Sequence, residues 1–142
     1  MPQTFYITLK ALIRNNDKYL LLVKERGGKN YWDMPGGRVE VDDTFTESLT
    51  RELQEEIIGI DKIIIKRRLD TVWELPKEFV QGSARQLTLF YLVDADVSKI
   101  NLSDEHSDFV WVDVSSLSAV KGDKDVILLD GYEQVLQEVF GR

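Results

Sequence analysis

Residues 44–58 limit the fold more than any other part of the sequence, because they contain neither glycine nor proline. Their apolar side chains recur every four residues, at Phe45, Leu49, Leu53 and Ile57. This spacing is the stripe of an amphipathic helix, which has to be buried against another layer. Asp43 or Thr44 can cap the start of this helix, and Gly59 suits its end.

Apolar runs with strand propensity lie on both sides of the predicted helix. Residues 5–13 and 19–23 precede it and are joined by a polar turn, which predicts an antiparallel hairpin. Three more strand-like runs follow it, at residues 62–75, 86–93 and 109–112. Residues 123–140 have helical spacing, with Gly131 as a candidate break. This order predicts one α/β domain over residues 1–142, with a mixed sheet packed between helices.

Composition excludes several classes of protein and site. With 142 residues, 43% of them hydrophobic, the chain can bury a core without disulfides. It has no cysteine, so a thiol nucleophile and a cysteine zinc site are excluded. We find no signal peptide and no run of ~20 apolar residues, and we expect a cytoplasmic protein with no membrane partner.

The charge of the chain argues against binding to nucleic acid duplexes. Its net charge is −7, so its overall field repels a phosphate backbone, and an anionic ligand needs a local cation. The chain contains one histidine, His106, which by itself cannot build a histidine-rich metal site. We interpret His106 as a loop residue.

Three carboxylates on the predicted helix are candidate ligands for a metal ion. Glu52, Glu55 and Glu56 are spaced i, i+3 and i+4, so they project from one side of the helix. Such like charges repel one another, and a divalent cation such as Mg²⁺ or Mn²⁺ compensates them and can bridge to phosphates. Arg51 lies one turn from Glu55 and can hold a carboxylate in place. The alternative is an ordinary solvated acidic face.

The segment between Gly37 and Gly59 resembles the Nudix box. The family pattern is glycine, five residues, glutamate, seven residues, then REUxEExGU, where U is aliphatic. Here RELQEE matches the central part fully, whereas Asp43 replaces the glutamate and Ile58 replaces the final glycine. We expect Asp43 to weaken the outer support of the helix and the change at Ile58 to extend the helix by one residue.

The resemblance implies a Nudix-like α/β/α sandwich with a mixed sheet between helices, and an Mg²⁺-dependent hydrolase of phosphoanhydrides. It implies four metal ligands, Glu52, Glu55, Glu56 and the main-chain carbonyl of Gly36, with Mn²⁺ as an alternative metal. Glu52 is the first candidate for the base that activates water. Arg51 is a further candidate catalytic residue, which would hold a carboxylate in place. Glu105 is a second candidate for the base or for a metal ligand, and its alternative interpretation is an exposed loop acid.

The substrate that the resemblance implies is a nucleotide-like diphosphate, such as a nucleoside triphosphate, a dinucleoside polyphosphate or a nucleotide sugar. Candidate phosphate contacts are Lys24, Arg26 and Arg38, each also plausible as a surface cation. Candidate stacking residues for a base are Tyr31, Trp32, Trp73 and Phe79, although strand aromatics commonly belong to the core. A catalytically degenerate nucleotide sensor and an acidic interaction domain stay open, as do a monomer and a homodimer.

Overall fold

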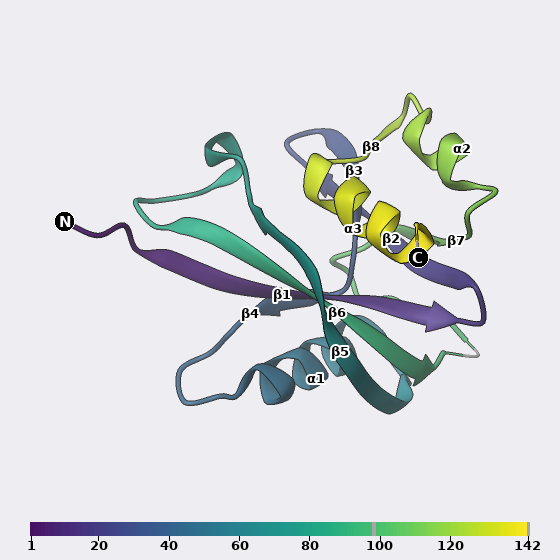
Figure 1. Cartoon of the computed structure of the whole chain (residues 1–142), viewed down its shortest axis with the longest axis horizontal. Coiled ribbons are helices and arrows are strands. Elements are labelled where there is room, and N and C mark those ends of the chain that lie inside the picture. Colours follow the sequence, from purple (N-terminus) through teal and green to yellow (C-terminus); the bar gives the residue numbers. More distant parts are fainter. Residues whose placement is uncertain (98, 142) are drawn as a thin grey trace.

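The computed structural model describes residues 1–97 and 99–141. Its strands are β1 (Phe5–Asn15), β2 (Lys18–Arg26), β3 (Lys29–Asp33), β4 (Gly36–Arg38), β5 (Asp61–Glu74), β6 (Arg85–Asp96), β7 (Asp108–Val112) and β8 (Val126–Ile127). Its helices are α1 (Phe45–Glu56), α2 (Leu117–Lys121) and α3 (Asp130–Phe140), with a 3-10 turn η1 (Lys77–Phe79). Figure 1 shows α1 on one face of the strands and α3 on the other.

The strands form a mixed sheet, as predicted. Their order is β5-β6-β1-β2-β3-β8, with β4 paired to β1 and β7 paired to β2. Strand β1 runs parallel to β6 along its length and antiparallel to β4 at Thr8, Leu9 and Lys10. The predicted hairpin is also present, since β1 and β2 pair antiparallel at their shared turn. The glycine-rich β4 thus lies directly beside β1, where the site described below is built.

Two apolar cores lie on opposite faces of the sheet, so the predicted α/β/α sandwich is confirmed. Leu49, Leu53 and Ile57 of the α1 segment are buried against one face. Val135 and Leu136 of α3 are buried against the other. The stripe that the sequence predicts is therefore buried except at its first position, since Phe45 is 41% exposed. None of the helices in the described ranges is long and apolar enough to cross a membrane.

Helix α1 begins as predicted and ends earlier than expected. Thr44 is the N-cap and forms a capping box with Glu47, in which each side chain accepts a hydrogen bond from the other main-chain amide. The helix stops at Glu56, so the expected extension is wrong. Ile57 forms an isolated bridge with Leu102, and these contacts with the loop before β7 draw the chain out of the helix. Gly59 follows with a φ of +86° in the turn.

The prediction of a helix over residues 123–140, with a break at Gly131, is also wrong in part. Residues 126–127 form β8, which pairs parallel with β3, and α3 begins only at Asp130. Gly131 lies inside α3 and is not a break. It is a close-packing position, because a Cβ there would lie 2.0 Å from the Cδ2 atom of Trp73.

We expect Gly131→Ala to lower the free energy of unfolding by about 1–3 kcal/mol, because the added methyl group clashes with the buried ring of Trp73. Urea denaturation followed by far-UV circular dichroism measures this change. Gln134→Ala, on the exposed side of the same helix, is the control and should change the value by less than about 0.5 kcal/mol. Equal stability of the two variants would contradict the packing that we describe.

Candidate functional site

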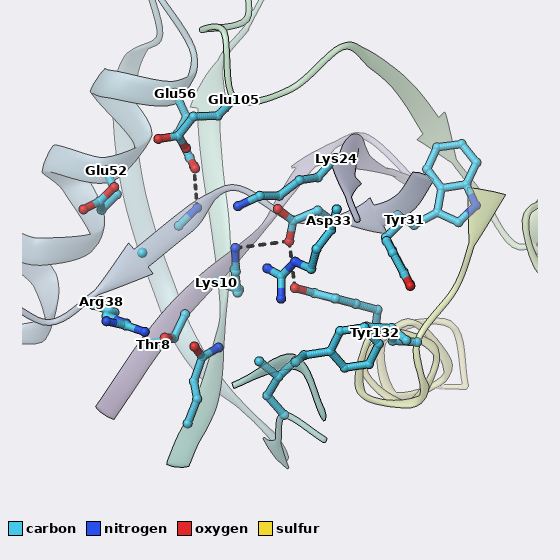
Figure 2. Close-up of a pocket in the computed structure, with 18 of the residues that line it drawn as sticks. Thr8, Lys10, Lys24, Tyr31, Asp33, Arg38, Glu52, Glu56, Glu105 and Tyr132 are labelled. Carbon is cyan, nitrogen blue, oxygen red and sulfur yellow. Dashed lines mark hydrogen bonds and ion pairs between the residues drawn. The ribbon is translucent and has the colours of Figure 1, made fainter. Parts of the chain in front are cut away.

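A cavity of about 390 Å³ lies where β1, β4, the end of α1 and the loop before β7 meet. Figure 2 shows Glu52, Glu56 and Glu105 on one side of it and Tyr31 and Tyr132 on the other. Its wall combines acidic, basic and aromatic side chains, including Thr8, Lys10, Lys24, Arg26, Tyr31, Trp32, Asp33, Arg38, Glu52, Glu56, Phe79, Glu105 and Tyr132. Charges of both signs therefore face one volume.

Glu56 is a buried carboxylate at the end of α1. Only 4% of the residue is exposed, and its Oε2 atom accepts a 2.6 Å hydrogen bond from the main-chain amide of Gly36. Burial raises the pKa of Glu56 to about 8, although the Lys10 ammonium and the Gly36 amide act in the opposite direction. The site therefore holds an acid whose charged form lacks full compensation by the protein.

Glu52 lies one turn before Glu56 and packs against the glycine loop. A Cβ at Gly37 would lie 2.4 Å from the carboxyl carbon of Glu52, so the carboxylate occupies the space that a larger residue would need. Partial burial raises the pKa of Glu52, and the nearby charges of Glu55 and Glu105 raise it further. Glu55 itself is exposed and is not among the residues that line the cavity.

Arg51 forms an ion pair with Asp43 outside the cavity. Its Nη1 atom contacts Asp43 Oδ2, and the same carboxylate accepts a 3.4 Å hydrogen bond from the hydroxyl of Ser48. The pair joins the loop before α1 to the middle of the helix. Asp43, which replaces the glutamate of the family pattern, is the partner of Arg51. Arg51 is placed to hold the helix and does not line the cavity.

Glu105 and His106 bring the loop before β7 into the site. One ligand atom from each of Glu56, Glu105 and His106 lies within 4.8 Å of the other two, the arrangement of a candidate metal site. Glu105 is exposed and lines the cavity, whereas His106 is buried. The interpretation of His106 as a loop residue describes its position but missed its burial and its partner.

That partner is Asp33, the centre of a buried polar network. Asp33 is in contact with the ammonium of Lys10 at 3.1 Å, the imidazole of His106 at 2.9 Å and the hydroxyl of Tyr132 at 2.7 Å. Burial alone would raise the pKa of Asp33, but the Lys10 charge and the two hydrogen bonds hold it far below its ordinary value. Asp33 is therefore ionised, and it holds three side chains in place.

Sequence reasoning missed Lys10, Asp33 and Tyr132, although two of them carried a signal. Lys10 is a single cation within an apolar strand, and Asp33 stands between two large apolar residues. A charge in such a run is costly to bury unless it is paired. The sequence does not show that the two residues pair, because they are 23 positions apart and belong to different strands.

The three predicted phosphate contacts all line the cavity. Lys24, Arg26 and Arg38 face it from the end of β2 and from β4. The guanidinium of Arg38 lies 4.2 Å from the centre of the Tyr6 ring, and that of Arg26 lies 5.9 Å from the centre of Phe79. A neighbouring groove, also lined by these three cations, continues from the cavity.

The predicted stacking residues separate into two groups. Tyr31, Trp32 and Phe79 line the cavity, and the rings of Tyr31 and Phe79 meet edge to face at 5.6 Å. Trp32 is only 7% exposed. Trp73 instead belongs to the core, where its ring lies 5.5 Å from that of Tyr132. Of the four predicted stacking residues, Tyr31 and Phe79 are thus the two that line the cavity and are partly exposed.

The family model of the NUDIX domain matches residues 7–129, a range that includes Glu52, Glu56 and Glu105. The chain belongs to the Nudix family. The match covers most of the chain and confirms the family that the box suggested. Members of this family typically use divalent metals.

Named relatives agree with the predicted enzyme class, a hydrolase of phosphorus-containing anhydrides. The Nudix chain is 35% identical over 83 residues to an RNA pyrophosphohydrolase of Marinomonas sp. (strain MWYL1), covering 56% of this chain and 51% of the relative. It is 27% identical over 124 residues to the nucleoside triphosphatase NudI of Enterobacter sp. (strain 638), covering 77% and 82%. The chain thus spans about half the length of the first relative.

A solved structure supports the Nudix fold. The crystal structure of the MutT protein from Methanosarcina mazei Go1 has a TM-score of 0.70 and 25% sequence identity to this chain. The similarity covers 100% of this chain and 96% of that protein. The fold is therefore similar over the whole of this chain and nearly all of that protein.

In metal-free buffer, we expect Glu56→Gln to stabilise the Nudix domain at high pH. The pKa of Glu56 is about 8 in the fold against 4.5 ordinarily, so the folded state binds more protons between these values and its stability falls as pH rises. Glutamine cannot ionise and can still accept the Gly36 amide. The gain in the free energy of unfolding of Glu56→Gln over the wild type should be larger at pH 8.5 than at pH 5 by at least ~1 kcal/mol.

Urea denaturation at the two pH values, with EDTA present, measures this difference. The exposed neighbour Glu55 provides the matched control, since Glu55→Gln removes a charge from the same helix without removing a buried one. A stability gain for Glu56→Gln that is the same at both pH values would show that Glu56 is not the buried acid described above.

Proposed function

We propose that residues 1–142 act as a Mg²⁺-dependent Nudix hydrolase that cleaves a phosphoanhydride bond in a nucleoside diphosphate linked to another moiety. The observation that carries this proposal is that acidic and basic side chains line one cavity. Glu52, Glu56 and Glu105 supply oxygen ligands for a cation, and the cations of β2 and β4 supply phosphate contacts. A substrate diphosphate can contact a bound cation and these basic side chains at once.

The residues present fit a hard divalent cation. The proposed ligands are the carboxylates of Glu52 and Glu56 and the carbonyl of Gly36, from residues that line the cavity, and the carboxylate of Glu55, from the exposed part of the same helix. All four are oxygen donors of the kind that Mg²⁺ prefers. Burial that raises the pKa of Glu56 leaves a carboxylate that a bound cation would stabilise in its charged form. When bound, Mg²⁺ would neutralise the charge that develops on the diphosphate.

Side chains of this chain account for the remaining steps. Glu52 is our first choice for the base that takes a proton from the attacking water, because it lines the cavity and burial raises its pKa. Glu105 is the second choice, and it lines the same cavity. Arg51 acts through its ion pair with Asp43 and is a positioning residue for α1.

For the substrate, we propose a nucleotide whose phosphates contact Lys24, Arg26 and Arg38 and whose base lies against Phe79 or Tyr31. Nucleoside triphosphates, dinucleoside polyphosphates and nucleotide sugars all satisfy this description. The names of the two relatives, a pyrophosphohydrolase and a nucleoside triphosphatase, support a nucleotide. We propose a monomer or a homodimer that needs neither duplex nucleic acid nor a membrane.

Release of phosphate or pyrophosphate from a panel of these three substrate classes tests the proposed reaction. We expect turnover of at least one class with Mg²⁺ or Mn²⁺ and none with EDTA. Glu56→Gln and Glu52→Gln should each lower kcat by at least ~100-fold, since each removes the charge of a proposed metal ligand.

Asp17→Asn is the matched control, because Asp17 is an exposed acid in the turn between β1 and β2 and lines neither this cavity nor the neighbouring groove. Its kcat should stay within about twofold of the wild type. If both cluster variants keep full activity, the proposed mechanism is wrong. If the folded wild-type protein binds nucleotides but turns over none of them with any metal, the degenerate nucleotide sensor replaces the hydrolase.

We expect Phe79→Ala to raise KM by about tenfold with a smaller effect on kcat, because stacking on an aromatic ring contributes ~1–3 kcal/mol per base. Steady-state kinetics on the substrate found in the panel measures both constants. Phe109→Ala removes a half-exposed ring from β7, outside the cavity, and should leave KM unchanged. An unchanged KM for Phe79→Ala would place the base elsewhere.

A further inference from the structure

Tyr6 lies on β1 just outside the cavity, in line with two residues that line it. Successive side chains of a strand point to opposite faces of the sheet, so Tyr6, Thr8 and Lys10 share one face. Thr8 and Lys10 line the cavity, whereas Tyr6 is 44% exposed and is not among the lining residues. The Tyr6 ring therefore extends this row of side chains beyond the edge of the cavity.

Arg38 contacts this ring from the neighbouring strand. In the antiparallel pairing of β4 with β1, Arg38 lies opposite Thr8, so Tyr6 is its diagonal neighbour, a separation that long side chains can span. The guanidinium carbon of Arg38 lies 4.2 Å from the centre of the Tyr6 ring, which is the distance of a cation–π contact. Arg38 itself lines the cavity and is labelled beside Thr8 in Figure 2.

The Tyr6 ring is the contact that orients the guanidinium of Arg38. Within residues 1–97 and 99–141, this guanidinium has the ring as its partner and forms no ion pair or hydrogen bond. Arg51, by contrast, is paired with the carboxylate of Asp43. An arginine carries several N–H donors in a planar fork, and a contact with a ring face leaves them free. Tyr6 therefore holds Arg38 at the cavity without occupying the donors that a phosphate would need.

This arrangement suits a phosphate group in particular. The planar fork of a guanidinium matches two oxygens of one phosphate, so both can accept hydrogen bonds at once. A free arginine side chain loses much rotamer freedom when it binds a ligand, and an arginine that is already held loses less. The Tyr6 contact should therefore increase the affinity for the substrate and leave the chemical step largely unchanged.

We propose that Tyr6 is a positioning residue of the substrate site, whose ring holds the Arg38 guanidinium in the orientation that binds one phosphate of the substrate through two N–H donors. This inference rests on the proposed function, because Arg38 is a proposed phosphate contact there. It adds a residue that lies outside the cavity and whose whole effect on affinity passes through Arg38.

NMR of the arginine side chains tests the contact without any turnover. The Nε–Hε resonance of Arg38 in ¹H–¹⁵N spectra of the full-length protein is identified by its absence in Arg38→Gln. Tyr6→Leu should move this resonance, because it removes the ring current of the aromatic side chain. Tyr6→Phe keeps a ring and should leave the resonance near its wild-type position. An Arg38 resonance that Tyr6→Leu does not move overturns the inference.

Inorganic pyrophosphate with Mg²⁺ is the probe for the phosphate contact. It should shift the Arg38 resonance, and Tyr6→Leu should raise its Kd about three- to fivefold, as expected for an exposed cation–π contact. Tyr6→Phe should keep the wild-type Kd. Phe5→Leu is the matched control, because the Phe5 ring lies 5.4 Å from the guanidinium of Arg85, which is paired with Glu74 and does not line the cavity. Equal Kd values for the two leucine variants would contradict the proposed role.

Steady-state kinetics separates positioning of Arg38 from direct contact with the substrate. Tyr6→Leu should raise KM by the same factor as the Kd of pyrophosphate and change kcat by less than about twofold. In the background of Arg38→Gln, Tyr6→Leu should have no further effect, because the two residues act as one unit. The same rise of KM in both backgrounds would mean that Tyr6 acts independently of Arg38, and would also overturn the inference.

The failure of this inference can be told apart from failure of the proposed function. Metal-dependent turnover with a KM that does not respond to Tyr6→Leu would remove the positioning role and leave the hydrolase intact. If the protein turns over no nucleotide, but pyrophosphate shifts the Arg38 resonance and binds more weakly to Tyr6→Leu, the positioning role stands and the proposed reaction is removed.

Discussion

The main-chain amide of Gly36 donates a hydrogen bond to the buried carboxylate of Glu56, and this contact joins the short strand β4 to the end of α1. It depends on two glycines. A Cβ at Gly36 would lie 1.9 Å from the carbonyl oxygen of Leu9, and its φ of +152° lies in a region that favours glycine. A Cβ at Gly37 would collide with Glu52. The loop can therefore approach both β1 and the acidic face of α1.

Two buried carboxylates that line one cavity have pKa values shifted in opposite directions. Asp33 has Lys10, His106 and Tyr132 as partners, which hold its pKa low. Glu56 accepts one short hydrogen bond from Gly36 within the described residues and also interacts with the Lys10 charge, but burial has the larger effect and raises the pKa of Glu56 to about 8. Carboxylates with pKa values shifted in opposite directions are typical of functional sites, where the structure accepts a local cost in stability. A bound cation would reverse that cost at Glu56.

The sequence departs from the family pattern at Asp43 and Ile58, and neither residue is among those that line the cavity. Asp43 has a shorter side chain than glutamate and forms an ion pair with Arg51. At Ile58 the chain has already left the helix, because the main-chain amide of Ile58 donates to the carbonyl of Asn101 in the loop before β7. That loop also carries Glu105 and His106. The end of α1 and the second half of the site are thus positioned by the same contacts.

The sequence by itself determined the local features: the amphipathic α1, the carboxylates on one side of it and the glycine loop before it, because these follow from spacing along a single segment. The family resemblance followed from the same segment. Only the tertiary structure decided that Lys10, Asp33 and His106 meet, because they belong to β1, β3 and a loop whose proximity depends on strand pairing. The C-terminal region was misjudged for the same reason, since β8 exists through its pairing with β3.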